Sequence, residues 1–191
     1  MSTQSIVTAI LLLGAVACGG SEGNDTPLTQ PTTVPRPTTR APVPASDIVG
    51  DYRVTFAASA LCSLPTETMK RTYDANVRAW VDYREVAVDV SGGAFLHEWA
   101  VGFGGTRDGD TVSFTIVGLQ ADDFSGFYDY GLAEVIDQTK WLTYDGTAVA
   151  RIAGHNITTG TFDGLIKLHD AKSGATLAEC RATDHKIEFV R

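Results

Sequence analysis

The stretch "TYDANVRAWV", residues 72–81, carries an apolar side chain at every second position. Successive side chains of a β-strand point to opposite faces, so this period predicts a strand with one face against a core. The members of the apolar series are Tyr73, Ala75, Val77, Ala79 and Val81.

The same pattern recurs along the chain, with turn signals about every ten residues. Turns are predicted at "VSGGA", "GGTRDGD", "AGHN" and "AKSGA", where Gly, Asp and Asn accept the backbone angles of tight turns. The other predicted strands are residues 50–58, 84–90, 94–102, 111–118, 132–137, 140–154, 156–170 and 176–190.

About nine short antiparallel strands and almost no helix place the chain in the all-β class. The segment "SLPTETMKR", residues 63–71, is the one plausible helical turn. Strands with one apolar face must cover that face. A single up-and-down antiparallel β-barrel of about 8–9 strands does so, and a two-sheet β-sandwich is the alternative.

An apolar segment, "IVTAILLLGAVA" at residues 6–17, lies near the N-terminus. It is too short to cross a bilayer, which takes about 20 residues. Residues 1–17 are therefore interpreted as a secretory signal peptide. Its first residues, "MSTQS", depart from the usual pattern because they contain no Lys or Arg.

The signal segment ends in "AVAC", Ala15 to Cys18, which resembles the lipobox of bacterial lipoproteins. The resemblance implies cleavage before Cys18, lipidation of that residue and anchoring to a bacterial membrane, in the periplasm or at the cell surface. Ala15 stands where the family usually has Leu, and Ala15-Val16-Ala17 also fits an ordinary signal-peptidase site.

Residues 18–46 are predicted to be a disordered tether. Six of the chain's 7 prolines lie in "TPLTQPTTVPRPTTRAPVPAS", residues 26–46. Proline fixes φ and lacks a backbone donor, so this segment favours an extended spacer over helix or sheet. The folded domain is therefore residues 47–191.

Cys62 and Cys180 lie in the predicted domain, on the segment after the first strand and on the last strand. Those strands are neighbours in an up-and-down barrel, and exported proteins keep disulfides, so we expect a Cys62–Cys180 bond. Neither cysteine belongs to a metal-binding motif, and no metal site is predicted.

The net charge of -8 argues against a nucleic-acid partner, whose phosphates need Lys and Arg. The sequence contains no nucleophile elbow, zinc-protease or phosphate-loop motif, so an enzyme is less favoured than a binding or structural protein but stays open, and no cofactor is expected. Composition leaves the oligomeric state open.

The sequence Gly50-Asp51-Tyr52 on the first strand, the strand count, the cross-link to the last strand and Arg191 together resemble the calycin, or lipocalin-like, architecture. The family signature is G-x-W, and here Tyr52 replaces the Trp. The resemblance implies a barrel that holds a ligand, but it carries over no ligand-binding residues.

The segment "DDFSGFYDYG", residues 122–131, is rich in aromatic residues, which offer contact area and hydrogen bonds to a ligand. We expect a binding module for a small apolar or amphipathic ligand, and a structural or protein-interaction lipoprotein of the cell envelope is the alternative. In that alternative the rings pack in the barrel. The candidate ligand-binding residues are Phe124, Phe127, Tyr128, Tyr130, His97 and Trp99.

Overall fold

A computed structural model describes residues 45–79, 84–96, 101–118 and 131–191. The predicted signal peptide and the tether up to residue 44 lie outside these ranges. No helix among the described residues is long and apolar enough to cross a membrane. The elements are η1 (Ala45–Asp47), β1 (Gly50–Ala57), η2 (Thr66–Thr68), β2 (Lys70–Ala79), β3 (Glu85–Ser91), β4 (Gly102–Asp108), β5 (Thr111–Ile116), β6 (Ala133–Asp137), β7 (Lys140–Ala153), β8 (Asn156–Asp170) and β9 (Thr176–Val190).

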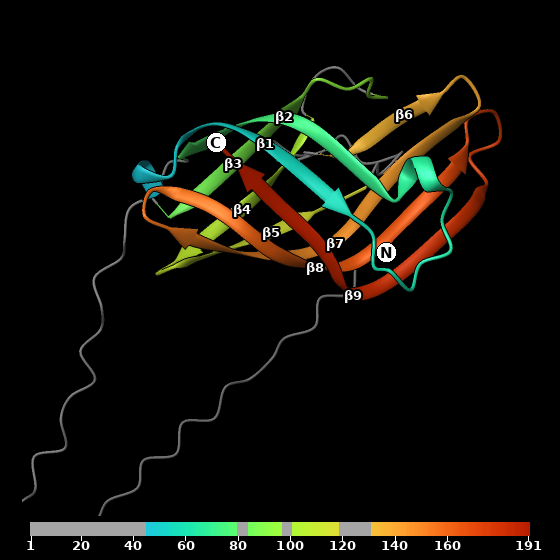
Figure 1. The fold of residues 1–191 in the computed structure, drawn as a ribbon. Coiled ribbons are helices and arrows are strands. Elements are labelled where there is room, and N and C mark those ends of the chain that lie inside the picture. Colours follow the sequence, from blue (N-terminus) through green and yellow to red (C-terminus); the bar gives the residue numbers. More distant parts are fainter. Residues whose placement is uncertain (1–44, 80–83, 97–100, 119–130) are drawn as a thin grey trace, which may run out of the picture. The chain divides into compact units, whose positions relative to one another are not determined.

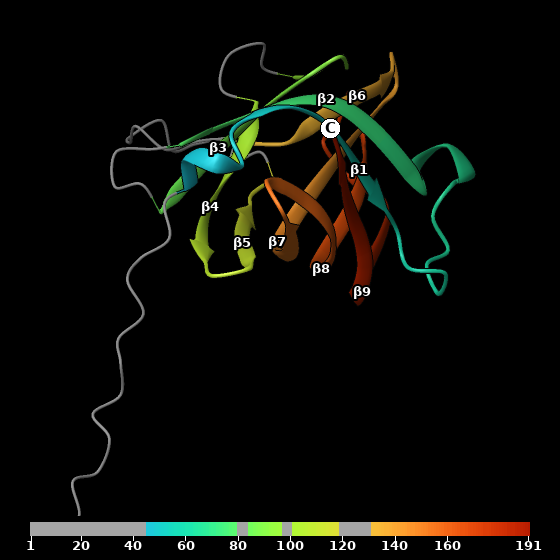
Figure 2. The same ribbon diagram turned by 60° about the vertical axis from the view of Figure 1, so that its left-hand side comes forward.

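Eight strands form a closed antiparallel barrel (Figure 1). Each strand pairs with its neighbour in the sequence from β1 to β5 and from β7 to β9, and the pairs β5–β7 and β1–β9 close the circle. Figure 2 shows β4, β5, β7, β8 and β9 side by side along one wall. The predicted up-and-down barrel is confirmed, and the chain does not form the alternative sandwich.

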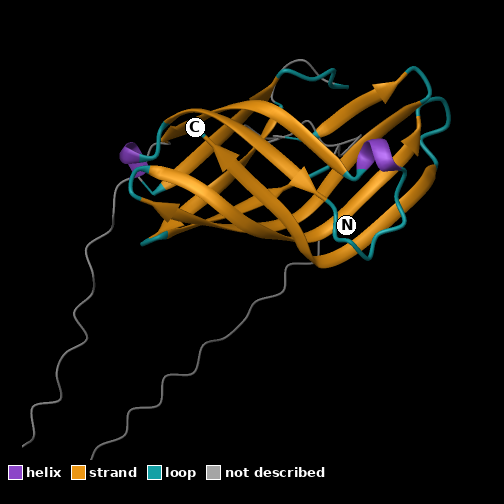
Figure 3. Ribbon diagram, viewed as in Figure 1, coloured by secondary structure: helices purple, strands orange, loops and turns teal. Residues whose placement is uncertain are grey.

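Strand β6 is the ninth strand and lies at one end of the barrel (Figure 3). It pairs with the first residues of β7, up to Thr143, whereas β5 pairs with the later stretch that begins at Gly146. The other edge of β6 is hydrogen-bonded to residues 94–96. There the Val135 amide donates to the Ala94 carbonyl at 2.7 Å. We call this the β6 end, and the opposite end the η1 end.

The η1 end is closed by the chain that enters β1. Ala45 and Ile48 are fully buried there, and the Tyr52 hydroxyl donates a 2.9 Å hydrogen bond to the Ile48 carbonyl. The buried guanidinium of Arg107 pairs with Asp47.

Aromatic rings fill the middle of the barrel. Every second side chain of a strand points into the barrel. The sequence predicts this for Tyr73, Ala75 and Val77, which are all buried. A continuous series of rings, with successive centroids 4.7–6.0 Å apart, runs through Tyr52, Phe189, Phe114, Phe103, Phe56 and Tyr144.

The fourth strand differs from the prediction. A strand was expected over residues 94–102 and a turn over 104–110, but β4 runs from Gly102 to Asp108. Phe95 and Val101 form only isolated bridges, and residues 97–100 lie outside the described ranges. Gly105 belongs to the strand because it pairs with Phe114 on β5, and a Cβ at this position would lie 2.5 Å from Phe114 Cδ1.

Candidate binding site at the β6 end

An ion pair lies inside the barrel at the β6 end. Arg71 on β2 pairs in register with the buried Phe56, so its side chain shares the inward face. Its Nε donates to Glu134 Oε2 at 2.7 Å, and its Nη2 donates to Glu134 Oε1. The Glu134 side chain is 4% exposed and that of Arg71 is 29% exposed, so the arginine alone reaches solvent.

Two tyrosines complete this network. The Tyr73 hydroxyl donates to Glu134 Oε2 at 2.8 Å, and the Tyr144 hydroxyl lies 3.2 Å from that of Tyr73. Since the Tyr73 proton is used on the carboxylate, the Tyr144 hydroxyl donates to the Tyr73 oxygen. Both side chains are buried, and every buried polar group of the network has a partner.

Burial sets the protonation state of the tyrosines. It raises the pKa of Tyr73 well above its ordinary value, and the nearby Tyr144 and Glu134 raise it further. Burial also raises the pKa of Tyr144. The hydrogen bond to Glu134 raises the pKa of Arg71, so the site holds one cation and two neutral hydroxyls at neutral pH.

The network also reaches the segment after β1. Arg71 Nη1 donates a 3.2 Å hydrogen bond to the Glu67 carbonyl of η2. Contacts within the described residues therefore use three of the five N–H groups of the guanidinium. The remaining two can donate to a polar group that enters from the β6 end.

The predicted disulfide is confirmed. Cys62 and Cys180 are bonded, with a Cα–Cα distance of 5.6 Å. The bond is possible because β1 and β9 are neighbours, so the segment after β1 lies beside the first half of β9. It attaches this segment to the barrel at the end where Arg71 lies.

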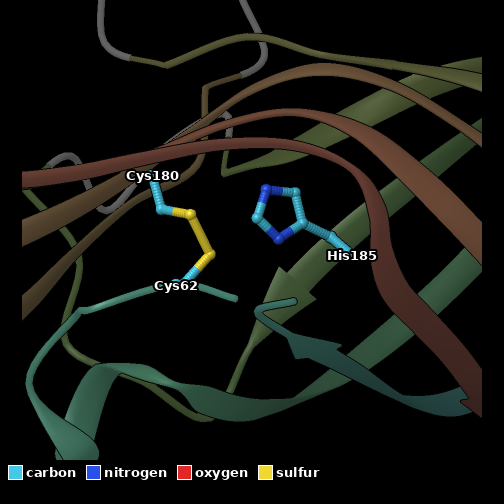
Figure 4. Close-up of side chains that lie close together, drawn as sticks. All are labelled: Cys62, Cys180 and His185. Atoms are coloured by element: carbon cyan, nitrogen blue, oxygen red, sulfur yellow. A yellow bond between two sulfur atoms is a disulfide. The ribbon is translucent and has the colours of Figure 1, made fainter. Parts of the chain in front are cut away.

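The fully buried His185 lies beside the disulfide (Figure 4). Its ring stacks on Phe162 with centroids 5.4 Å apart, and the Ser59 amide donates to its Nδ1 at 2.9 Å. Its Nε2 is buried without a hydrogen-bond partner among the described residues. Burial lowers the pKa of His185, which is therefore neutral at pH 7.

Cys62, Cys180 and His185 bring three potential metal ligands within 4.8 Å of one another. They do not fit a metal ion in this state. The two sulfur atoms are bonded to each other and offer no thiolate. Coordination through Nε2 requires the proton on Nδ1, where the Ser59 amide already donates.

The residues singled out from the sequence for ligand binding, Phe124, Phe127, Tyr128, Tyr130, His97 and Trp99, lie outside the described ranges, as does Cys18. Sequence analysis missed Arg71, Glu134, Tyr144 and His185. One signal was available for Arg71, which lies two residues before Tyr73 and so falls on the apolar side of the alternation. Glu134 lies in a segment without clean alternation and gave no such signal.

Comparisons with protein-family models, curated proteins and solved structures found no match. The calycin and lipoprotein resemblances therefore stay predictions.

Proposed function

We propose that the chain is a membrane-tethered, extracytoplasmic binding module whose barrel takes a small amphipathic ligand at the β6 end. The observation that carries the proposal is the Arg71–Glu134 pair, which lies inside an apolar barrel at the end that η1 does not close. The apolar part of the ligand contacts the barrel wall, and its polar group accepts hydrogen bonds from Arg71.

Stability alone accounts poorly for this ion pair. An apolar pair of similar volume is often as stabilising as a buried salt bridge, or more so. Eight-stranded barrels are just wide enough for side chains or for one small ligand. A partly exposed arginine with two further N–H groups is well suited to hold the polar group of such a ligand.

The proposed location rests on the N-terminal sequence and on the disulfide. The apolar run that ends at Cys18 and the proline-rich segment behind it are typical of a lipid anchor and a tether. Disulfides persist in oxidising compartments outside the cytoplasm. The Cys62–Cys180 bond supports the same location.

The test uses the full chain with Cys18→Ser, so that no attached lipid competes for the site. Titration with anilinonaphthalene sulfonate, an anionic amphiphile, is expected to give saturable binding with a micromolar Kd. The variant Arg71→Met with Glu134→Gln removes both charges together, so neither remains unpaired. It is expected to weaken binding at least tenfold.

The matched control is Arg78→Met with Asp89→Asn, which removes a pair exposed on the outer face of β2 and β3. It is expected to leave the Kd unchanged. Absence of saturable binding, or equal weakening in the two variants, contradicts the proposal. Urea unfolding of each variant shows whether a loss of binding reflects a loss of folded protein.

A second candidate function is a structural or protein-interaction domain with a filled interior. The series of touching rings from Tyr52 to Tyr144 favours it, because these side chains occupy the middle of the barrel. This candidate predicts that neither double variant changes the fluorescence of the probe, and that Arg71 and Glu134 affect stability alone.

A further inference from the structure

The unpartnered ring nitrogen of His185 is the one buried polar side-chain atom, among the described residues, that lacks a hydrogen bond. Nδ1 accepts from the Ser59 amide, so the proton of the neutral ring is on Nε2. Nε2–H therefore makes no hydrogen bond of normal geometry to the described residues, although the backbone of Gly164 and of Cys180 lies near enough to raise the pKa of the ring. Such a group destabilises the state in which it stays unpaired.

The disulfide lies close to this ring and can also supply an acceptor. A ring nitrogen of His185 and the two sulfur atoms lie within 4.8 Å of one another. Figure 4 shows the ring beside the S–S bond, with Cys180 and His185 on the same strand. A disulfide sulfur is a weak acceptor, whereas a thiolate is a charged and strong one.

We propose that Cys62–Cys180 is an exchange-active disulfide whose reduced form is stabilised by a hydrogen bond from His185 Nε2–H to the Cys180 thiolate. The inference does not depend on ligand binding at Arg71. It assigns a function to His185 and a redox chemistry to a bond that otherwise has only a structural role.

The reaction partner is a dithiol. Cys62 lies on the segment after β1, next to Leu61, which is 87% exposed, and both cysteines are partly exposed. A thiolate of the dithiol attacks Cys62 Sγ, the S–S bond breaks, and Cys180 leaves as the thiolate beside His185. The second thiol then attacks the mixed disulfide and releases Cys62. The protein gains two electrons and one proton, which is on Cys62, while Cys180 stays a thiolate. The dithiol becomes a disulfide, and its second proton passes to the solvent.

Reduction releases one of the attachments of the segment after β1. The Ser59–His185 bond and the 2.8 Å bond from the Ala58 amide to the Met69 carbonyl remain. Residues 60–65 then lose their covalent link to β9. The same segment leads to η2, whose Glu67 carbonyl accepts from Arg71, so its release alters the β6 end.

The test measures the equilibrium between the full chain and dithiothreitol, with the fraction of reduced protein read by thiol alkylation and mass spectrometry. His185→Phe keeps a ring against Phe162 and removes the donor. It is expected to lower the equilibrium constant for reduction about tenfold, which corresponds to about 30 mV. His169→Phe is the control, since His169 stacks on Trp141 with centroids 3.9 Å apart and hydrogen-bonds Thr143.

A second measurement keeps the wild-type chain, in case His185→Phe fails to fold. The ¹⁵N chemical shift of His185 Nε2 is expected to move on reduction, as it gains a thiolate acceptor. The proposal is overturned if the shift stays unchanged, or if His185→Phe alters the equilibrium no more than His169→Phe. Anilinonaphthalene sulfonate plays no part in either measurement, so this result is independent of the binding result.

Discussion

The guanidinium of Arg191 lies over the ring of Tyr52, with its Cζ 5.3 Å from the ring centroid. Its Nη1 also donates to the His155 carbonyl and to Asn156 Oδ1, both at 3.1 Å. Two of the residues on which the calycin resemblance rests are therefore in contact. Their contact connects the end of β9, the start of β1 and the turn between β7 and β8.

Arg191→Ala is expected to lower the free energy of unfolding by about 1–2 kcal/mol, because it removes a cation–π contact and several partly exposed hydrogen bonds. Urea denaturation measures the change. Arg181→Ala, on the exposed face of the same strand, is expected to change it by less than about 0.5 kcal/mol. Equal effects of the two variants contradict this role for Arg191.

Gly105→Ala is expected to destabilise the barrel by about 1–3 kcal/mol, because overpacking forces side chains and backbone to shift. The new Cβ would lie 2.5 Å from Phe114 Cδ1 and 2.8 Å from the Ser113 carbonyl oxygen. Gly104→Ala is the control, with its nearest neighbour, the Val86 carbonyl oxygen, at 3.9 Å. Thermal melts should show a lower Tm for Gly105→Ala alone. An equal drop in Tm for Gly104→Ala would mean that the close contact with Phe114 is not the cause of the destabilisation.

Glu134→Gln is expected to cost about 1–3 kcal/mol, because it leaves the Arg71 cation without its carboxylate. The partial exposure of Arg71 keeps the cost below that of a fully buried pair. Asp89→Asn breaks the exposed pair with Arg78 and is expected to cost at most about 1 kcal/mol. Chemical unfolding of both variants gives the comparison, and a Glu134→Gln effect no larger than that of Asp89→Asn refutes the prediction.

Cys62→Ser with Cys180→Ser is expected to lower the free energy of unfolding by about 2–5 kcal/mol, since the bond closes a long loop in the unfolded chain. The two residues are 118 positions apart in sequence. Wild-type protein unfolded in a reducing agent should lose a similar amount. If the double variant is as stable as the oxidised wild type, the bond does not restrain the unfolded chain.

Stability is expected to fall with decreasing pH below about 6.5, the ordinary pKa of histidine. Burial lowers the pKa of His185 in the folded state, so the unfolded chain takes up a proton that the folded chain does not. Each pH unit between the two pKa values therefore costs up to about 1.4 kcal/mol. The check is urea unfolding at pH 7.5 and 5.5, where His185→Phe should flatten the difference.

His155→Gln is the control for this pH dependence, because the His155 side chain is 78% exposed. It should keep the wild-type loss of stability between the two pH values. If His185→Phe loses as much stability between pH 7.5 and 5.5 as the wild type does, groups other than His185 cause the pH dependence.

The sequence by itself determined the fold class. Alternation at Tyr73, Ala75 and Val77 follows from the pleat of a strand, which every β-strand shares, so it can be read locally. The Cys62–Cys180 bond could also be predicted from the sequence, because an up-and-down order makes the first and last strands neighbours. The bounds of β4 could not be predicted from the sequence, since Gly104 and Gly105 favour a turn when their strand partners are unknown.

Only the tertiary structure decided which polar residues meet. Arg71 and Glu134 are 63 positions apart, and Ser59 and His185 are 126 apart. No local pattern links such pairs, because closure of the barrel and the position of β6 set their distances. His185 looked like an ordinary member of an alternating strand, and its burial beside the disulfide appears only once β9 lies next to the segment after β1.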